Sequence, residues 1–280
     1  MSDLSCALSV VVVSYNARVH LEKCLGSLRD HPPEVSHEVI VVDNASTDDS
    51  ELAARRWQDV RVIQSGANRG FAVATNIGIR ASRGEHLLLL NSDAVVRVGA
   101  IDAMLEVMRR RPEVAVVGPR LVDELGRVEL SFGPMIAPLA ELRQRRLVRA
   151  ATAGDSWAVG RVAALTATER CPDWVSGACL LVRRQDAEAV GLLDERYFMY
   201  TEDVDFCAAI RARGRKVLFT PTAEVVHARG RSVATAPEAT RAAYRRSHLA
   251  FYEKHHALLA PILRLYLRLR GELPSHQPAR

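Results

Sequence analysis

The sequence predicts an α/β fold, with a Rossmann-like, mostly parallel central sheet and helices on both faces. Three observations predict it. The chain has 280 residues, 48% hydrophobic and 25% charged, which is ordinary for a folded globular protein. Over residues 1–120, short apolar runs rich in β-branched residues alternate with longer stretches of helical spacing. Polar residues follow each run, at the edge where such sheets bind ligands.

The predicted elements follow in order along the chain. In the first half, apolar runs predict strands over 8–13, 38–42, 60–63, 86–90 and 114–117. Between them, helical spacing predicts helices over 18–29, 48–57, 71–82 and 99–110. The second half predicts a strand over 174–182, a helix over 184–190, a helix opened by 200–205, and a strand pair at 216–219 and 224–226. Residues 131–172 lose this regularity and are interpreted as a variable segment.

We expect one domain over 1–235, with a first half over 1–120 and an α+β second half over 121–235. A basic helical extension and tail follow over 236–280. Residues 241–270 carry seven Lys or Arg against one acid, Glu253, with apolar residues at helical spacing. Such a segment can lie on an anionic membrane, or it can dock on its own domain with a break at Pro261. The spacing leaves both interpretations open.

Charge and cysteine usage narrow the class of protein. The formal charge of +5 suits an anionic ligand or an anionic membrane as well as nucleic acid. An aromatic content of 5%, without a base-stacking or groove-reading motif, argues against nucleic acid. Five scattered cysteines without a CxxC pair predict reduced, buried thiols. The N-terminus lacks the order of a secretory signal and no apolar run reaches ~18 residues, so we expect a cytoplasmic protein.

Polar residues at the predicted strand ends form a candidate ligand-binding group. Ser and Thr in such positions usually cap the next helix. A carboxylate at the lip of a strand, as at Asp43, can instead accept the N3 proton of a uracil or thymine ring. No GxGxxG follows the first strand, which disfavours a dinucleotide site. The side chains in this group are Ser14, Asn16, Asp43, Asn44, Asn68, Asn91, Ser92 and Asp93.

A divalent metal offers another way to hold phosphates. Asp93 follows the run LLLLN at the ligand edge, and Mg²⁺ and Mn²⁺ favour oxygen ligands that they share with substrate phosphates. Alone, Asp93 would more often cap a helix and His227 would more often be structural. Together they form a candidate pair of metal ligands, and Arg229 and Arg231 can neutralise a leaving diphosphate.

Three carboxylates crowd into the expected start of a helix, at Glu202, Asp203 and Asp205. Such acids stabilise the helix dipole, and adjacent acids also push each other's pKa values apart. We expect Asp203 to take a proton from a sugar hydroxyl, and Glu202 to bind the acceptor or orient a neighbour. Trp174 either stacks on an acceptor sugar or packs in the core. Gly177 would let substrate approach the backbone.

Seven motifs occur in order within residues 8–255. They are VVVVSYN at 10–16, VIVVDNASTDDS at 39–50, NRGFAVATNIGI at 68–79, LLLLNSDA at 87–94, WVSGACLLVRR at 174–184, YFMYTEDVDFCAAIRARG at 197–214 and VVHARGRS at 225–232. Taken together, they resemble glycosyltransferase family 2, and more narrowly its bacterial rhamnosyltransferase-like branch. The resemblance implies a GT-A fold and an inverting transfer from a nucleotide-diphosphate sugar, with Mg²⁺ or Mn²⁺ on the diphosphate.

The resemblance also implies roles for individual residues. It assigns Asp43 to the nucleobase, Asp93 to the last acid of a DxD-type metal motif, Asp203 to the base of an ED motif and His227 to the metal. The polar residues listed above at the strand ends would bind the nucleotide-sugar donor. Asn76, within the motif at 68–79, joins this donor-binding group, as does Arg229. Asn91 stands where a full DxD has an acid, which puts the strength of metal binding in doubt.

The resemblance narrows the reaction as well. The chain lacks the QxxRW signature and membrane helices of processive synthases, which implies addition of a single sugar. The branch favours dTDP-rhamnose as donor, with UDP-sugars next, and a glycan or polyprenyl-diphosphate-linked acceptor for cell-surface polysaccharide. Such an acceptor would place the protein at the inner face of the membrane and favours a peripheral contact through 241–270. The alternative is a non-catalytic nucleotide-sugar-binding subunit of an assembly complex; the sequence does not fix an oligomeric state.

Overall fold

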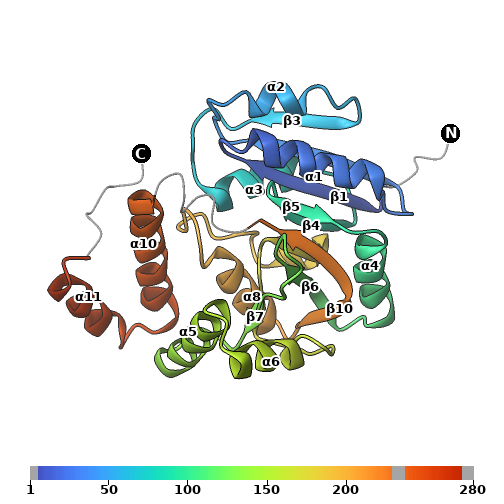
Figure 1. Ribbon diagram of the computed structural model, residues 1–280. Coiled ribbons are helices and arrows are strands. Elements are labelled where there is room, and N and C mark those ends of the chain that lie inside the picture. The colour runs from blue at the N-terminus through green and yellow to red at the C-terminus, as the bar shows by residue number, and fades with distance from the viewer. Residues whose placement is uncertain (1–5, 229–236, 273–280) are drawn as a thin grey trace.

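The computed structural model describes residues 6–228 and 237–272. Within them, eight strands form one sheet in the order β3-β2-β1-β4-β9-β6-β10-β5 (Figure 1). These strands are β1 (Leu8–Ser14), β2 (His37–Asp43), β3 (Val60–Gln64), β4 (His86–Asn91), β5 (Ala94–Val96), β6 (Val114–Val122), β9 (Cys179–Arg183) and β10 (Lys216–His227). A separate pair joins β7 (Phe132–Gly133) and β8 (Trp174–Val175).

The sheet is mixed but mostly parallel, as predicted. Strands β3, β2, β1 and β4 run parallel, and β10 runs parallel to β6. Strand β9 lies antiparallel between β4 and β6, and β5 lies antiparallel to β10. The pairing register sets Ser14 opposite Asp43, and Val13 opposite Asn91. The carboxyl ends of β1, β2 and β4 therefore meet at one edge of the sheet.

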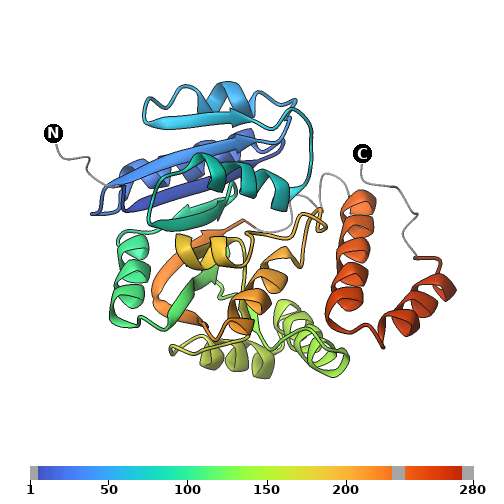
Figure 2. The same ribbon diagram turned by 180° about the vertical axis from the view of Figure 1, so that it is seen from behind.

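Helices cover both faces of the sheet (Figures 1 and 2). On one face, α1 and α4 contribute Leu21, Met104 and Met108 to a buried cluster, and on the other face α3 and α8 contribute Ile79 and Phe206. The apolar residues of α4 recur at three- and four-residue spacing, which gives the helix one buried side. The helices are α1 (Arg18–Asp30), α2 (Ser50–Ala54), α3 (Phe71–Ala81), α4 (Ala100–Arg110), α5 (Pro138–Thr152), α6 (Ser156–Leu165), α7 (Arg184–Ala189), α8 (Glu202–Ala212), α10 (Pro237–His255) and α11 (Ala260–Leu269).

Two features of the second half differ from the sequence prediction. The predicted strand pair is one strand, β10, both parts of which run parallel to β6 with a register shift between Thr220 and Glu224. Pro221, which suggests a turn, lies in this irregularity, where a missing backbone donor is tolerated. The predicted strand over 174–182 is two strands, broken at 176–178. Residues 131–172, for which no regular element is predicted, contain α5 and α6.

The C-terminal helices behave differently from each other. Helix α10 buries Phe251 and Tyr252 against Tyr197 and Val204 of the main body. The chain then turns over 256–259, and Pro261 lies in the first turn of α11, where a proline starts a helix rather than breaking it. Own-domain docking is thus correct for α10. Helix α11 exposes much of its apolar surface, and no helix in the described ranges is long and apolar enough to cross a membrane.

The cysteines are free thiols, but they are not all buried. Cys24, Cys179 and Cys207 lie in the core, and burial raises the pKa of the Cys207 thiol to about 12. Cys171, which precedes Pro172 outside any helix or strand, is exposed. The expectation of buried thiols is therefore wrong for Cys171.

Candidate active site

Asp43 and Ser14 meet at the ends of β2 and β1, with buried polar atoms left over. Asp43 is 1% exposed, and its Oδ2 accepts a hydrogen bond from the Ser46 amide at 3.0 Å. Its Oδ1 is buried without a hydrogen-bond partner, and so is the Oγ of Ser14 directly across the pair of strands. Buried polar atoms are normally satisfied, so two unpartnered ones on neighbouring strand ends indicate a site that a polar ligand completes.

The loops after β1 and β2 hold each other in place. Asn16 has a left-handed backbone (φ 48°). Its side-chain oxygen accepts a hydrogen bond from the backbone amide of Thr47 at 2.7 Å, and its backbone amide donates to the Ser46 Oγ at 3.0 Å. Asn16 therefore braces the two loops around Asp43, although its side chain is exposed at the same edge.

Asn44 and Asn68 tie the end of β2 to the loop that precedes α3. The Nδ2 of Asn44 donates to the Asn68 Oδ1 at 3.0 Å, and the Oδ1 of Asn44 accepts from the Ser65 Oγ at 3.0 Å. The loop ends at Gly70 (φ 87°), where a Cβ would lie 2.3 Å from the backbone oxygen of Phe198. The glycine thus permits close contact between this loop and the segment that leads into α8.

Asn76 lies away from the strand ends. It is 1% exposed on α3, and its side-chain oxygen accepts from the Leu193 amide at 3.1 Å. Its Nδ2 donates to the Leu193 carbonyl at 2.8 Å and to the Glu195 carboxylate at 2.9 Å. The side chain therefore fastens α3 to the segment after α7, and its hydrogen-bonding groups are used in doing so.

Asp93 and His227 face each other across the pairing of β5 with β10. The Nε2 of His227 lies 3.4 Å from the Asp93 Oδ1, and its Nδ1 lies 3.6 Å from the Glu129 Oε2. Burial lowers the pKa of His227, but the two neighbouring carboxylates outweigh burial and raise the pKa to about 9. Sequence reasoning missed Glu129, since nothing in the motifs points to it.

The two groups fit a cation that is shared with a ligand. Among the described residues, no three His, Cys, Asp or Glu side chains converge as a complete metal cage. A carboxylate and an imidazole side by side nevertheless offer Mn²⁺ or Mg²⁺ two ligands of suitable chemistry, and a diphosphate commonly supplies further oxygens. Ser92, the neighbour of Asp93, is buried. The backbone amide of Asn91 donates a hydrogen bond to the Ala178 carbonyl at 3.0 Å. Arg229 and Arg231 lie outside the described residues.

Glu202 and Asp203 open α8 after two residues with strained backbone. Tyr200 (φ 71°) and Thr201 (φ 66°) are both left-handed, a costly conformation for such residues that is common at functional sites. Asp203 accepts hydrogen bonds from the Gly177 and Val204 amides, each at 2.8 Å. Glu202 is 7% exposed, and its Oε2 has no hydrogen-bond partner.

Glu202 and Asp203 differ in how strongly their surroundings raise the pKa of the carboxyl group. Burial, and then the charge of Asp203, raise the pKa of Glu202 well above its ordinary value. Burial also raises the pKa of Asp203, but the amides of Gly177 and Val204 counteract it because they stabilise the carboxylate. A single proton in this pair therefore belongs on Glu202, which leaves Asp203 as the carboxylate that can act as a base.

The acid pair and the strand ends lie at one site. The Asn91 amide bonds to Ala178, the neighbour of Gly177, whose own amide bonds to Asp203. After burial, the charges of Glu202 and Asp93 both raise the pKa of Tyr200. The structure thus brings the segment that carries Asp93 and the Glu202–Asp203 pair close to each other, with Tyr200 near both.

Trp174 and Gly177 have structural contacts here. The indole Nε1 of Trp174 donates to the Pro134 carbonyl at 2.8 Å, and the partly buried ring packs on two hydrophobic clusters. A Cβ at Gly177 would lie 3.2 Å from the Cβ of Asp203. The glycine therefore makes room for the Asp203 side chain.

Asp205, the third acid, clamps α8 to α10. It is buried, its Oδ2 lies 2.8 Å from the Lys254 Nζ, and its Oδ1 lies 2.6 Å from the His255 Nε2. The Tyr197 hydroxyl adds a hydrogen bond at 3.2 Å. The sequence places Asp205 in a first helical turn, but it contains no signal for partners some fifty residues further along the chain.

Comparison with known proteins identifies relatives over most of the chain. Residues 9–165 match Glycosyl transferase family 2. The chain is 34% identical to the N-acetylglucosaminyl-diphospho-decaprenol L-rhamnosyltransferase of Mycobacterium tuberculosis, over 96% of this chain and 92% of that protein. It is 26% identical to a low-salt glycan biosynthesis hexosyltransferase of Haloferax volcanii, over 79% of this chain and 66% of that protein.

Solved structures share the fold at lower identity. A mannosyltransferase from Pyrobaculum calidifontis, in complex with GDP-Man and Mn²⁺, superposes with a TM-score of 0.62 at 20% identity, over 93% of this chain and 70% of that chain. S. aureus TarS in complex with UDP-GlcNAc gives 0.58 at 17% identity, over 85% and 64%. Together with the family match, these likenesses establish that the chain belongs to glycosyltransferase family 2, has the GT-A fold and is a glycosyltransferase.

Proposed function

We propose that this protein transfers a single sugar, with inversion, from a nucleotide-diphosphate sugar to a glycan or polyprenyl-diphosphate-linked acceptor. The donor is dTDP-rhamnose, with UDP-sugars as the next candidates. The mycobacterial relative is an N-acetylglucosaminyl-diphospho-decaprenol L-rhamnosyltransferase, which supports rhamnose as the transferred sugar and a polyprenyl-diphosphate-linked acceptor. The observation that carries the proposal is the acid pair at α8, in which two backbone amides favour an ionised Asp203 beside a protonated Glu202.

Asp43 and Ser14 would read the nucleobase. The buried, unpartnered Oδ1 of Asp43 can accept the N3 proton of thymine or uracil, and the Ser14 hydroxyl can bond to a neighbouring carbonyl of the ring. Asn16, Asn44 and Asn68 shape the loops around this pocket. The donor half is thus residues 1–120, and the acceptor half is residues 121–235.

Asp93 and His227 would hold a divalent cation at the diphosphate, with Glu129 orienting the His227 ring through its Nδ1. Mg²⁺ or Mn²⁺, when bound, would neutralise charge on the leaving diphosphate. Asn91 supplies a neutral amide at the position where a full DxD motif has an acid. Solved structures that contain Mn²⁺ share the fold and support this assignment.

Asp203 performs the proton transfer in this scheme. Its carboxylate takes the proton from an acceptor hydroxyl, whose oxygen forms a bond to the anomeric carbon as the bond to the diphosphate oxygen breaks. The nucleoside diphosphate leaves with the electron pair of that bond, and the anomeric centre inverts. Glu202, protonated, can donate a hydrogen bond to the acceptor. One base suffices because no covalent intermediate forms.

The donor site is tested by ligand protection against thermal unfolding. The protein is heated with dTDP-, UDP- and GDP-sugars, each with Mn²⁺ and with EDTA. A ligand at 100 times its Kd adds about 2.7 kcal/mol to the stability of the folded state. We expect metal-dependent protection by dTDP- or UDP-sugars but not by GDP-sugars. No protection by any of them at saturation would contradict the proposed function.

A further inference from the structure

Helix α11 carries an apolar stripe on its solvent side. Leu258, just before the helix, and Ile262, Leu265 and Leu269 within it recur at three- and four-residue spacing. Their exposed fractions are 92%, 65%, 56% and 79%. Leu267, on the opposite side of the helix at about 100° per residue, is fully buried. The helix thus docks by one side and presents a second, continuous apolar side to the surroundings.

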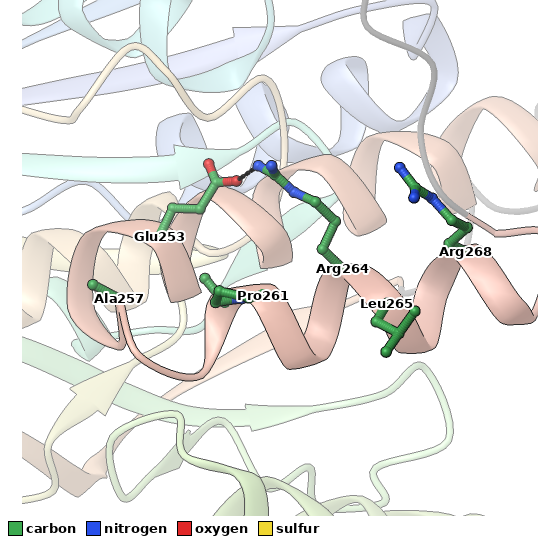
Figure 3. Close-up of a pocket in the computed structure, with 7 residues that line it drawn as sticks. Glu253, Ala257, Pro261, Arg264, Leu265 and Arg268 are labelled. Carbon is green, nitrogen blue, oxygen red and sulfur yellow. Dashed lines mark hydrogen bonds and ion pairs between the residues drawn. The ribbon is translucent and has the colours of Figure 1, made fainter.

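Arginines flank the stripe on both sides. At about 100° per residue, Arg264 and Arg268 fall on one flank and Arg270 on the other. Figure 3 shows Arg264 turned back to an ion pair with Glu253 of α10, while Leu265 points away from that ion pair. Residues Ala260–Leu269 contain no acid, although Arg270 pairs with Glu272 just after the helix. An apolar stripe bordered by cations is the pattern of a helix that lies in a membrane interface.

Two further helices toward this end of the molecule also expose apolar and basic side chains. In both views, α5, α6 and α11 lie toward the same end of the molecule, opposite α2 and β3 (Figures 1 and 2). Helix α5 has no buried residue and exposes Leu139, and α6 exposes Trp157 at 72%. Arg143, Arg146 and Arg149 are also exposed on α5.

We propose that α11 is an interfacial helix that docks the protein on an anionic lipid surface through Leu258, Ile262, Leu265 and Leu269. The proposal deepens the proposed function and rests on its lipid-linked acceptor. A lipid surface fits better than a second copy of the chain for two reasons. Leu258 and three side chains of a ten-residue helix cover less than the roughly 800 Å² per partner of a stable protein interface, and a second copy would bring like-charged arginines together.

The helix is tested in the full-length chain, because removing residues 241–280 would also remove the buried Phe251 of α10. The variant is Leu265→Gln with Leu269→Gln. Its matched control is Leu52→Gln with Leu125→Gln, two leucines outside α11 that are 57% and 76% exposed. Co-sedimentation is measured with phosphatidylcholine vesicles, alone and with about a third phosphatidylglycerol.

We expect wild type and control to bind the anionic vesicles and the α11 variant to bind them at least tenfold more weakly, with binding reduced by salt. Equal binding by the α11 variant, or no binding by wild type, would overturn the proposal. Self-association that the variant abolishes, without vesicle binding by wild type, would assign the stripe to a second copy and also overturn it. Thermal protection by soluble donors, measured without vesicles, reports separately on the proposed function and should be equal in all variants.

Discussion

At the scale of single residues, the candidate site is built from polar atoms that the fold leaves incompletely satisfied. Asp43 and Ser14 each keep one buried atom without a partner, and Glu202 keeps another. Such atoms destabilise a folded protein unless a ligand or a proton compensates them. Their position at the ends of β1 and β2 and at the start of α8 places this cost where substrate would bind.

Replacing Asp43 with Asn tests the nucleobase contact. The amide oxygen of Asn can still accept from the Ser46 amide, but its NH₂ group would meet the donor N3–H of the ring. We expect the Kd for dTDP or UDP, measured by calorimetry, to rise roughly 10- to 100-fold, equivalent to the loss of a hydrogen bond to a charged group. Asp30→Asn, at an exposed carboxylate on α1, should leave it unchanged. An unchanged Kd for Asp43→Asn would remove Asp43 from the donor site.

Replacing Glu202 with Gln tests the buried acid through stability. Because burial raises the folded-state pKa of Glu202, the folded protein resists its ionisation. The penalty is absent below the unfolded pKa of about 4.3, grows as pH rises from there to the folded pKa, and is constant above it. Glu202→Gln should therefore stabilise the protein by about 1 to 2 kcal/mol at about pH 8, and by nearly nothing at about pH 4. Urea unfolding at both pH values measures this. A gain that is the same at both would show that Glu202 is not forced to stay protonated.

Sequence predicts some of these residues better than others. Asp43, Asp93 and Asp203 can be located because parallel strands and helix starts place the residue after an apolar run at a known edge. Glu129 cannot be located in this way. It follows β6 in the chain and comes near His227 only because β10 pairs with β6 in the sheet. The structural use of Asn76 is equally hidden, because its partners Leu193 and Glu195 are more than a hundred residues away.

At the scale of elements, α10 belongs to the folded body and supports α8. Phe251 is fully buried against Tyr197 and Val204, and Asp205 of α8 pairs with Lys254 and His255 of α10. These ion pairs, in which Asp205 is buried and its partners are partly exposed, hold the first turn of α8, which also carries Glu202 and Asp203. The orientation of Glu202 and Asp203 therefore depends on a helix in the C-terminal extension.

Truncating Phe251 to Ala tests whether α10 is part of the folded core. Loss of a fully buried aromatic ring costs about 3 to 5 kcal/mol, so the midpoint of urea unfolding should fall accordingly. Leu258→Ala, at a side chain that is 92% exposed, should change the stability by less than about 0.5 kcal/mol. Equal effects of the two substitutions would show that α10 does not contribute to the folded core.

The first half of the chain is more predictable at this scale than the second. Strands β1, β2, β3, β4 and β6 begin at or within one residue of the predicted positions because buried parallel strands are continuous apolar runs. Strand β5 is only three residues long, too short for a pattern. In β10, Pro221 interrupts the apolar run although the strand continues past it. Helix α5 has no buried residue, so it lacks the apolar stripe by which helices are recognised.

At the scale of the whole molecule, two half-sites meet at one edge of the sheet. The first half supplies Asp43 and Ser14 from β2 and β1, together with Asp93 after β4. The second half supplies His227 from β10, and Asp203 from α8. The backbone amide of Asn91 donates a hydrogen bond to the Ala178 carbonyl and so joins the two halves, and within the second half the Gly177 amide donates to Asp203. In the proposed function, residues of both halves would hold the donor, through Asp43 and Asp93 of the first half and His227 of the second, and the second half would supply the base Asp203.

The most direct test of this account is turnover by the Asp203→Asn variant. Nucleoside diphosphate released from dTDP-rhamnose, or from the UDP-sugar that protects best, is measured with a polyprenyl-diphosphate N-acetylglucosamine acceptor. Asn keeps the shape of Asp203 but cannot take the proton, so kcat should fall by roughly 10²- to 10⁴-fold. The Kd of the donor should stay within about twofold of wild type, and Asp59→Asn, at an exposed acid, should leave both unchanged. Turnover at the wild-type rate in Asp203→Asn would contradict the account, and an inactive wild type that still binds donor would indicate a non-catalytic nucleotide-sugar-binding subunit.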